Sequence, residues 1–518
     1  MNFEKFKKTI LNVKKHNSSK TTFELSLGSK GFTIFTKSIR AENYFCLFVI
    51  KENNSKFFVV AFDKSDSGKI NFTGEDLALS NNVTLRKCLL NNENSKKLQT
   101  QFDFLKPKVI GLKNSFGFGD RLGIANAGHL RSLEGLDFEP VLAQQSIREL
   151  TRTHRKPSDV MDAAVFACLQ EGWTKGFGAD ADHLKKNEDI KLMLKAGYTF
   201  FTFDPSDYVN NDADILNEEK LNSILDEFEW KQFNTSYQKL NEKYCRNKLS
   251  INNNNLVLEV SVMELKRAIV KYGNALLHIK TLYEYLLEIK TSQDVEVEIS
   301  IDETESVTSA FEHYFISDQL HRLGIVYVSL APRFIGDFEK GIDYKGDIQV
   351  FENEFKKHVS ILKQFGDYKL SLHSGSDKFT AYKIIAKYNI PIHIKTAGTS
   401  YLEALRTIAS VKPDLFRKIL DYSRSLYNEE KRTYHVSAVV EKTKPAVEYS
   451  DEELPELLND NNARQILHVT YGRILTDKNS QGEYLFKEKL FNTLIGNQDL
   501  YDKFLTKHFI RHLSPFRK

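Results

Sequence analysis

The chain has 518 residues, of which 41% are hydrophobic and 27% charged, as in ordinary globular proteins. Its formal net charge is only +4 and its basic residues are dispersed, whereas a nucleic-acid-binding protein usually gathers them in one patch. No run approaches the roughly 18 apolar residues that a membrane-spanning helix needs. We therefore expect a globular protein that binds neither nucleic acid nor a membrane.

Residues 1–105 contain short apolar runs, FCLFVI (45–50) and FFVVAF (57–62), separated by polar turns. Such runs are typical of strands joined by hairpins. The segment shows no charged cluster that suggests chemistry. We predict an N-terminal β-rich accessory domain over residues 1–105.

Residues 106–430 follow a different pattern, in which short strand-like runs are mostly followed by helical stretches. This alternation predicts a parallel sheet. Eight such units closing on themselves would form a TIM-barrel-like (β/α)8 core. The eight runs lie at residues 108–119, 138–146, 172–180, 198–204, 294–302, 324–332, 368–375 and 390–398.

Two further segments accompany the predicted barrel. Between its fourth and fifth strands, residues 205–293 form an insertion with the run Asn252–Asn255, which we expect to be a loop, and then a long helix. In that helix apolar residues recur every three or four positions, which favours packing on the flank of the barrel. They are Leu265, Ile269, Tyr272, Leu276, Ile279 and Leu282. Residues 431–518 are predicted to form a mixed, mainly helical C-terminal extension packed on the barrel.

The four cysteines and the first residues of the chain indicate the compartment. The cysteines are far apart and form no CxxC pair, so they build neither a disulfide framework nor a zinc cage and fit a reducing environment. The beginning of the chain, MNFEKFKKTILNVKKHN, lacks the long apolar core of a signal peptide. We expect a cytoplasmic protein.

Polar residues gather where the predicted barrel strands end. In a barrel of this type the reacting groups lie at the carboxyl ends of the strands. Arginine binds a carboxylate or phosphate through two hydrogen bonds, and lysine binds it as a point charge. A negatively charged substrate is therefore expected, although each residue taken alone could simply be a solvated surface group. The candidate substrate-binding residues are Asp120, Arg148, Arg333, Ser374, Lys378 and Lys395.

Three histidines are candidate metal ligands. His373 and His393 lie in apolar strands that are neighbours in the predicted barrel, about 4.8 Å apart, and His183 follows the third strand. A lone strand histidine is more often a buried core residue, but three that converge on one mouth favour a metal site. Nitrogen-rich ligation suits zinc, nickel, cobalt or manganese better than calcium.

Two carboxylates are candidates for acid–base catalysis. Asp182 precedes His183, and Glu303 follows the fifth strand, so the two could act on opposite faces of a substrate. Asp182 could equally cap the following helix, and for Asp180 the capping role is preferred. Glu303 competes with Asp302 and Glu305, since spacing alone does not choose among them.

Several of these segments, read in order, resemble the tagaturonate epimerase family. They include SFGFGDRLG, QQSIRELTRT, GFGADADHLK, SIDETE, KLSLHSGSDKF and ELPELLNDNNARQILHVTYG, and the resemblance runs from about residue 108 to the C-terminus. It implies a divalent-metal-dependent epimerase that interconverts D-tagaturonate and D-fructuronate in hexuronate catabolism. It also implies Asp182 and Glu303 as catalytic residues and His183, His373 and His393 as metal ligands.

Alternatives remain open on these residues. Inversion could proceed by retro-aldol cleavage, rotation of the aldehyde fragment and re-formation of the bond, or by proton removal and return at the inverted carbon. The substrates could be the free ketohexoses fructose and tagatose. A barrel glycoside hydrolase with two carboxylates and a non-catalytic uronate-binding protein are the other readings. A homo-oligomer is compatible with the sequence.

Overall fold

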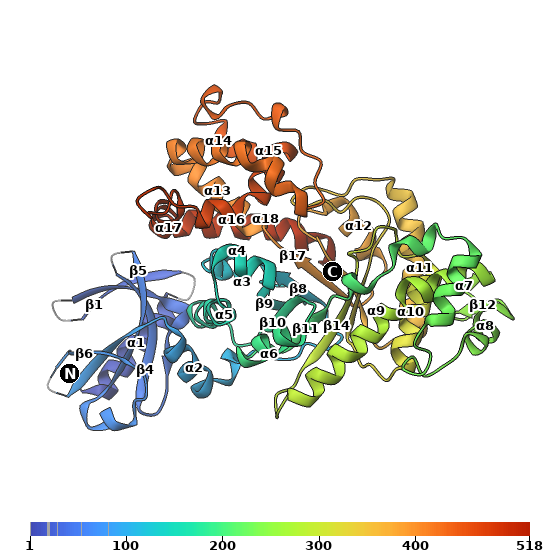
Figure 1. Ribbon diagram of the computed structural model, residues 1–518. Helices are drawn as coiled ribbons and strands as arrows, with labels where there is room; N and C mark the ends of the chain where they lie inside the picture. Colours follow the sequence, from blue (N-terminus) through green and yellow to red (C-terminus); the bar gives the residue numbers. More distant parts are fainter. Residues whose placement is uncertain (1, 18–20, 28–29, 53, 81, 518) are drawn as a thin grey trace.

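The computed structural model describes residues 2–17, 21–27, 30–52, 54–80 and 82–517. A central barrel lies between an N-terminal β-sheet and an insertion rich in helices, and C-terminal helices stand over one side of it (Figure 1). Among the described residues, no helix is both long and apolar enough to cross a membrane.

The barrel is closed and its strands are parallel, which confirms the predicted fold class. Seven of the eight predicted runs contain one strand each, and the run 172–180 overlaps the beginning of β10 (Gly178–Leu184). Most strands are buried along their whole length, because side chains fill the barrel inside and helices cover it outside. In spatial order they are β10 (Gly178–Leu184), β11 (Phe200–Phe203), β14 (Glu296–Ile301), β15 (Ser329–Pro332), β16 (Lys369–Leu372), β17 (Ile392–Thr396), β8 (Ser115–Phe118) and β9 (Glu139–Ser146).

Helices occupy the connections between these strands. The insertion also carries the short helical turns η4 (Ser206–Tyr208) and η5 (Asn211–Asp214) and the hairpin β12 (Leu249–Ile251) and β13 (Leu256–Leu258). The helices are α3 (Asn126–Ser132), α4 (Ile147–Thr153), α5 (Pro157–Glu171), α6 (Asn187–Lys195), α7 (Glu218–Glu227), α8 (Tyr237–Cys245), α9 (Val262–Ile289), α10 (Ala310–Arg322), α11 (Ile348–Phe365), α12 (Phe379–Lys387) and α13 (Thr399–Val411).

Helix α9 is the long helix predicted in the insertion. Its six predicted apolar positions are all buried, and it packs against α6, α7 and α10. The asparagine run joins β12 to β13, and Asn252, Asn253 and Asn254 adopt positive φ angles of 51°, 54° and 67°. Asparagine tolerates this left-handed conformation better than most residues, which explains the composition of the turn.

The N-terminal region is an antiparallel sheet with helices. The two predicted apolar runs are the central strands β4 (Phe45–Glu52) and β5 (Ser55–Asp63), which pair from Phe45 with Phe62 onward. One face of these strands joins the main core, and the other face packs with helix α1 (Phe3–His16). The other elements are β1 (Thr22–Leu27), β2 (Lys30–Phe35), β3 (Arg40–Ala41), β6 (Gly74–Ala78), β7 (Val83–Leu89), α2 (Asn92–Gln101), η1 (Thr36–Ser38), η2 (Lys64–Lys69) and η3 (Asp103–Leu105).

The C-terminal extension is helical and packs on the barrel. Its last long helix, α18 (Gln498–Leu513), contacts α3 and α13 (Figure 1). The other elements are α14 (Pro413–Glu430), α15 (Asn461–Val469), α16 (Tyr471–Thr476), α17 (Lys487–Gly496), η6 (Lys431–Thr433), η7 (Val440–Lys442), η8 (Ala446–Glu448), η9 (Leu454–Asn459) and η10 (Ser514–Phe516).

A buried ionic cluster fastens α18 to the barrel. His508 Nε2 lies 2.5 Å from Asp377 Oδ1, and its Nδ1 lies 3.1 Å from Glu403 Oε1. Arg464 Nη2 donates to the second oxygen of Asp377 at 2.6 Å. Burial disfavours the charged imidazole, but the Glu403 and Asp377 carboxylates override it and raise the pKa of His508 to about 9.

Replacing His508 with alanine is expected to destabilise the protein by about 3–5 kcal/mol, since it removes the cation that two buried carboxylates share and leaves them only Arg464 and Arg406. The thermal midpoint should fall by about 3–5 °C for a chain of this length. The folded pKa is raised above the usual value of about 6.5, so the stabilisation is complete below that pH and is lost as the pH rises through 9. The control is His16→Ala, at an exposed position. An equal thermal midpoint in both variants would contradict the stabilising role of the ionic cluster around His508.

Candidate active site

The carboxyl ends of the barrel strands surround a cavity of about 520 Å³. Its lining comes from the segments after β9, β14, β15 and β16, and from residues 432–435 of the C-terminal extension. The lining side chains that could take part in binding or catalysis are Arg148, Asp302, Glu303, Arg333, Lys340, His373, Ser374, Arg432 and His435. The cavity is therefore polar and carries both acids and bases.

Asp302 and His373, which line this cavity, and the adjacent His183 could share one cation, and these three side chains are here called the cavity floor. Nitrogen or oxygen atoms of His183, Asp302 and His373 lie within 4.8 Å of one another. His373 Nδ1 lies 3.0 Å from Asp302 Oδ1, and the two imidazole centroids are 5.0 Å apart. His373 Nδ1 is buried and has no well-aligned hydrogen-bond partner among the described residues. Two imidazoles and a carboxylate are a donor set that fits zinc, manganese, nickel or cobalt.

A carboxylate orients each of the two histidines by pairing with the ring nitrogen that faces away from the shared position. Asp182 Oδ1 lies 2.8 Å from His183 Nδ1, and Glu298 Oε1 lies 2.7 Å from His373 Nε2. Each imidazole thus presents its other nitrogen to the shared position. Carboxylate–histidine pairs of this kind fix the tautomer of a metal ligand and increase its basicity, so the surroundings of the three donors also fit a cation.

Lys395 lies beneath this arrangement and ties it together. Its Nζ is 2.7 Å from Asp180 Oδ2, 2.8 Å from Asp182 Oδ1 and 2.8 Å from Glu298 Oε1. Burial opposes a charged lysine, but the three carboxylates outweigh it and hold the pKa of Lys395 well above its usual value. Lys395, predicted to bind substrate, contacts instead the carboxylates that orient the histidines.

Replacing Lys395 with methionine should remove the cation that three buried carboxylates share. Asp182 and Glu298 would keep only their histidines, and Asp180 would keep no cationic partner among the described residues. The expected cost is about 3–5 kcal/mol of stability, together with a 10- to 100-fold loss of metal affinity through Asp182 and Glu298. Thermal unfolding and metal titration measure both effects. The exposed Lys191→Met is the matched control; a Lys395→Met protein with normal metal affinity would contradict this positioning role.

The charges of the floor follow from these contacts. Burial alone would lower the pKa of both histidines. Asp182 instead raises the pKa of His183 to about 10, and Asp302 together with Glu298 raises the pKa of His373 to about 9. Burial would raise the pKa of Asp182, but His183 and Lys395 hold it well below its usual range. Asp182 is therefore a fixed carboxylate and a weak proton acceptor.

The structure does not bring His393 to this group. In the register of β16 with β17, Ser371 pairs with His393 and Leu372 with Ile394, so the next level places His373 beside Lys395. His393 lies deeper in the barrel, with Nδ1 2.9 Å from Ser115 Oγ, and burial holds its pKa well below the usual value. Asp302, rather than the predicted His393, lies with His183 and His373 in the candidate cation set.

Glu303 faces the cavity mouth. Its side chain is 42% exposed, and Oε1 lies 3.8 Å from His183 Nε2. Glu303 and His183 also form a second candidate cation set with Asp204, but that set includes only one imidazole, whereas the first has two. Glu303 is thus a carboxylate next to the candidate cation position and accessible from the cavity.

The predicted substrate-binding residues fall into two groups. Arg148, Arg333 and Ser374 line the cavity. Lys378 does not, because its Nζ is buried against backbone carbonyl groups, including those of Glu339 and Ser376.

Asp120 likewise serves the backbone rather than the cavity. Its carboxylate accepts hydrogen bonds from the backbone N–H groups of Leu122, Gly123 and Ala125. Asp180, expected to cap a helix, is buried within β10 and paired with Lys395 instead, and Lys186 stands at the start of α6.

Backbone strain marks the same region. His183 and Ser374 adopt positive φ angles of 54° and 52°, a conformation that is uncommon for residues other than glycine. At His183 the pairing of β10 with β11 also shifts, between Ala181 and Leu184. Such strain clusters at functional sites, where the surrounding structure enforces it.

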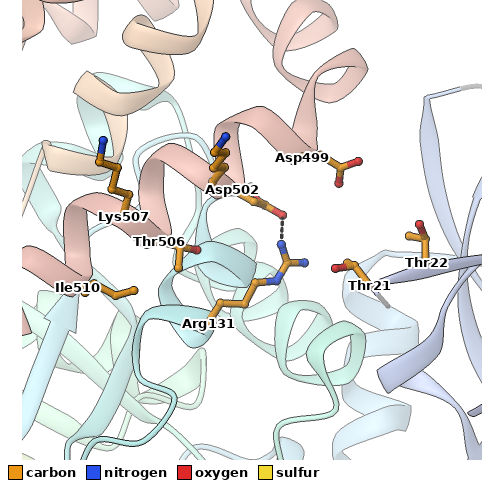
Figure 2. A pocket seen from close by; sticks show the side chains of 9 residues that line it. Thr21, Thr22, Arg131, Asp499, Asp502, Thr506, Lys507 and Ile510 are labelled. Atoms are coloured by element: carbon orange, nitrogen blue, oxygen red, sulfur yellow. Dashed lines mark hydrogen bonds and ion pairs between the residues drawn. The ribbon is translucent and has the colours of Figure 1, made fainter. Parts of the chain in front are cut away.

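A larger cavity, of about 730 Å³, lies between the N-terminal region and α18 (Figure 2). Two of its charged side chains are paired, since Arg131 Nη1 donates to Asp502 Oδ2 at 2.9 Å. Arg131 Nη2 also lies 2.6 Å from Glu171. Its described lining contains neither histidine nor cysteine. The barrel cavity is thus the better candidate for catalysis.

Comparisons with known proteins agree over nearly the whole chain. A model of the tagaturonate epimerase family matches residues 35–516. The tagaturonate/fructuronate epimerase of Thermotoga maritima is 40% identical over 486 residues, which cover 94% of this chain and 97% of the relative.

Solved structures agree as well. A glycerol-complexed crystal structure of fructuronate-tagaturonate epimerase UxaE from Cohnella laeviribosi matches with a TM-score of 0.88 at 34% identity, and the native crystal structure with 0.87 at 35%. Both comparisons cover 98% of this chain and 99% of theirs. With its fold, its polar barrel mouth and these similarities, the chain belongs to the tagaturonate epimerase family and is an enzyme of the isomerase class.

Proposed function

We propose that this enzyme interconverts D-tagaturonate and D-fructuronate in hexuronate catabolism, with a divalent cation held by His183, Asp302 and His373. The observation that carries the proposal is the cavity itself. It joins a metal-type donor set at its floor to arginines in its wall, in a chain of the tagaturonate epimerase family.

The arginines favour the sugar acid over the free ketohexose, because a guanidinium pairs with a carboxylate that the neutral sugar lacks. The family relationship speaks against the glycoside hydrolase and the non-catalytic binding protein. The four cysteines are unpaired, which supports a reducing, cytoplasmic setting.

The two sugars differ at a carbon that is not adjacent to the ketone, so simple enolisation does not make its hydrogen acidic. A bound divalent cation would supply Lewis-acid stabilisation of negative charge on the ketone oxygen. The protein must then provide a base for the hydroxyl group of the carbon that is inverted. Glu303 is suited to this task, since its carboxylate is accessible and next to the metal position.

The contacts of Asp182 favour the retro-aldol path. Proton exchange on opposite faces needs two free acid–base groups, but Asp182 Oδ1 is already engaged by both His183 and Lys395. In the retro-aldol path Glu303 takes the hydroxyl proton as the carbon–carbon bond breaks. The aldehyde rotates, the bond re-forms on its other face, and Glu303 returns the proton to the new alkoxide.

Two measurements test the proposal. Incubation of the protein with D-tagaturonate and zinc, manganese, nickel or cobalt should yield D-fructuronate, and absence of conversion with all four would contradict the function. In deuterium oxide, the retro-aldol path predicts no deuterium at the inverted carbon of the product. Incorporation there with each turnover would instead establish proton exchange.

A further inference from the structure

A short segment of the C-terminal extension completes the cavity wall. Residues 431–435, here called the cavity strap, follow α14 and include η6. Arg432, Thr433, Tyr434 and His435 all line the cavity. The barrel alone would leave this side of the site without its wall.

The cavity strap is fastened from two sides. On one side Arg152 of α4 donates to the Tyr434 hydroxyl at 2.5 Å and to Thr433 Oγ1 at 3.0 Å. On the other, the backbone N–H of Lys340 donates to the His435 carbonyl at 3.4 Å. The strap is therefore attached to α4 and to the loop after β15, and both of these also line the site.

The strap sets two guanidinium groups toward the cavity. Arg432 belongs to it, and the guanidinium of Arg148 lies 5.3 Å from the centre of the Tyr434 ring. Among the described residues, no carboxylate lies within ion-pair distance of Arg148 or Arg432. By contrast Arg152, behind them, is bonded to the strap itself. Arg333 also lines the cavity without an ion-pair partner among the described residues. Arginines without a protein counter-ion in one cavity favour an anionic ligand.

The acids of the site come from a different element of the fold. Asp302 and Glu303 follow β14 and adjoin His373 and His183, whereas Arg148 and Arg432 come from α4 and the strap. A substrate with a ketone at one end and a carboxylate at the other matches this division of charge. The volume of about 520 Å³ is within the range of small-molecule sites.

We infer that Arg432, together with Arg148 placed against Tyr434, binds the carboxylate of the substrate, so that the cavity strap selects sugar acids over neutral ketoses. This inference rests on the proposed function, because it assigns one end of that substrate. In a retro-aldol path these two arginines would retain the fragment that carries the carboxylate while its aldehyde group rotates.

The test is binding of D-galacturonate, an aldose with its single carboxylate on carbon 6, to the metal-loaded enzyme by isothermal titration calorimetry. Arg432→Gln should weaken binding about 10- to 100-fold, the range for a hydrogen bond to a charged group. Arg432→Lys keeps the charge but not the paired hydrogen bonds, so its affinity for D-galacturonate should lie between those of the wild type and Arg432→Gln. D-galactose should bind equally to all variants, and metal content should not change.

Lys431→Gln is the matched control, because it removes the same charge from the same turn but does not line the cavity. Wild-type affinity in Arg432→Gln, or an equal loss in Lys431→Gln, would overturn the inference. Turnover of D-tagaturonate separates this inference from the proposed function. If the wild-type enzyme epimerises D-tagaturonate while Arg432→Gln binds D-galacturonate with wild-type affinity, only the carboxylate-binding role of Arg432 is refuted. A protein that binds D-galacturonate through Arg432 without epimerising refutes the function alone.

Discussion

Replacing His183 or His373 with alanine is expected to remove the bound cation and to lower kcat/KM for D-tagaturonate by about 10³-fold. The two imidazoles and Asp302 are the donors that converge at the cavity floor, so the loss of one leaves too few ligands for tight binding. Loss of Lewis-acid stabilisation worth about 4 kcal/mol corresponds to a factor of about 10³ in rate. Metal analysis of the purified variants and steady-state kinetics measure both effects.

His393→Asn is the informative companion to these variants. His393 lies deeper in the barrel and bonds to Ser115, so its replacement should leave one equivalent of metal in place even if the protein is less stable. Stoichiometric metal in both His183→Ala and His373→Ala, or loss of metal only in His393→Asn, would contradict the proposed ligand set.

Replacing Glu303 with glutamine should lower kcat by about 10²- to 10⁴-fold, the usual contribution of a general acid–base group. Metal content should stay the same, because Glu303 lies beside the three donors and is not one of them. Kinetics with D-tagaturonate, together with metal analysis of the same sample, make the measurement.

Glu305→Gln is the matched control for Glu303. Glu305 is two residues away and exposed, but it does not line the cavity, so its replacement should leave kcat unchanged. If Glu303→Gln keeps kcat within a few-fold of the wild-type value, another group must move the proton.

The barrel was predictable from sequence because its strands are buried from end to end and recur with helices between them. Helix α1 was not predicted, although Phe3, Phe6, Ile10 and Val13 are buried at helical spacing. The repeat of these four apolar positions was the signal that could have revealed it.

The site was predictable only in part, because it depends on strand register. His183 and His373 were identified as residues at strand ends, and the structure brings them together. A sequence does not show that β17 presents Lys395, rather than His393, at the level of His373. The same limit hides the contacts that draw Lys378 and Asp120 to backbone groups.

Two of the cavity residues that were missed, Lys340 and Arg432, lie away from the strand ends. Lys340 lies in a loop well beyond the end of β15, and Arg432 comes from the extension after the barrel. Neither is next to a strand end, so a search confined to strand ends passes over them. Only tertiary packing of the C-terminal extension brings Arg432 to the site.

The central claim is that a divalent cation at His183, Asp302 and His373 is required for epimerisation. It is tested most directly by stripping the enzyme with a chelator, confirming that no metal remains, and titrating zinc, manganese, nickel and cobalt back while conversion of D-tagaturonate is followed. The account predicts no conversion by the metal-free enzyme and recovery that saturates at one cation per chain. Full conversion by enzyme with no remaining metal would contradict it.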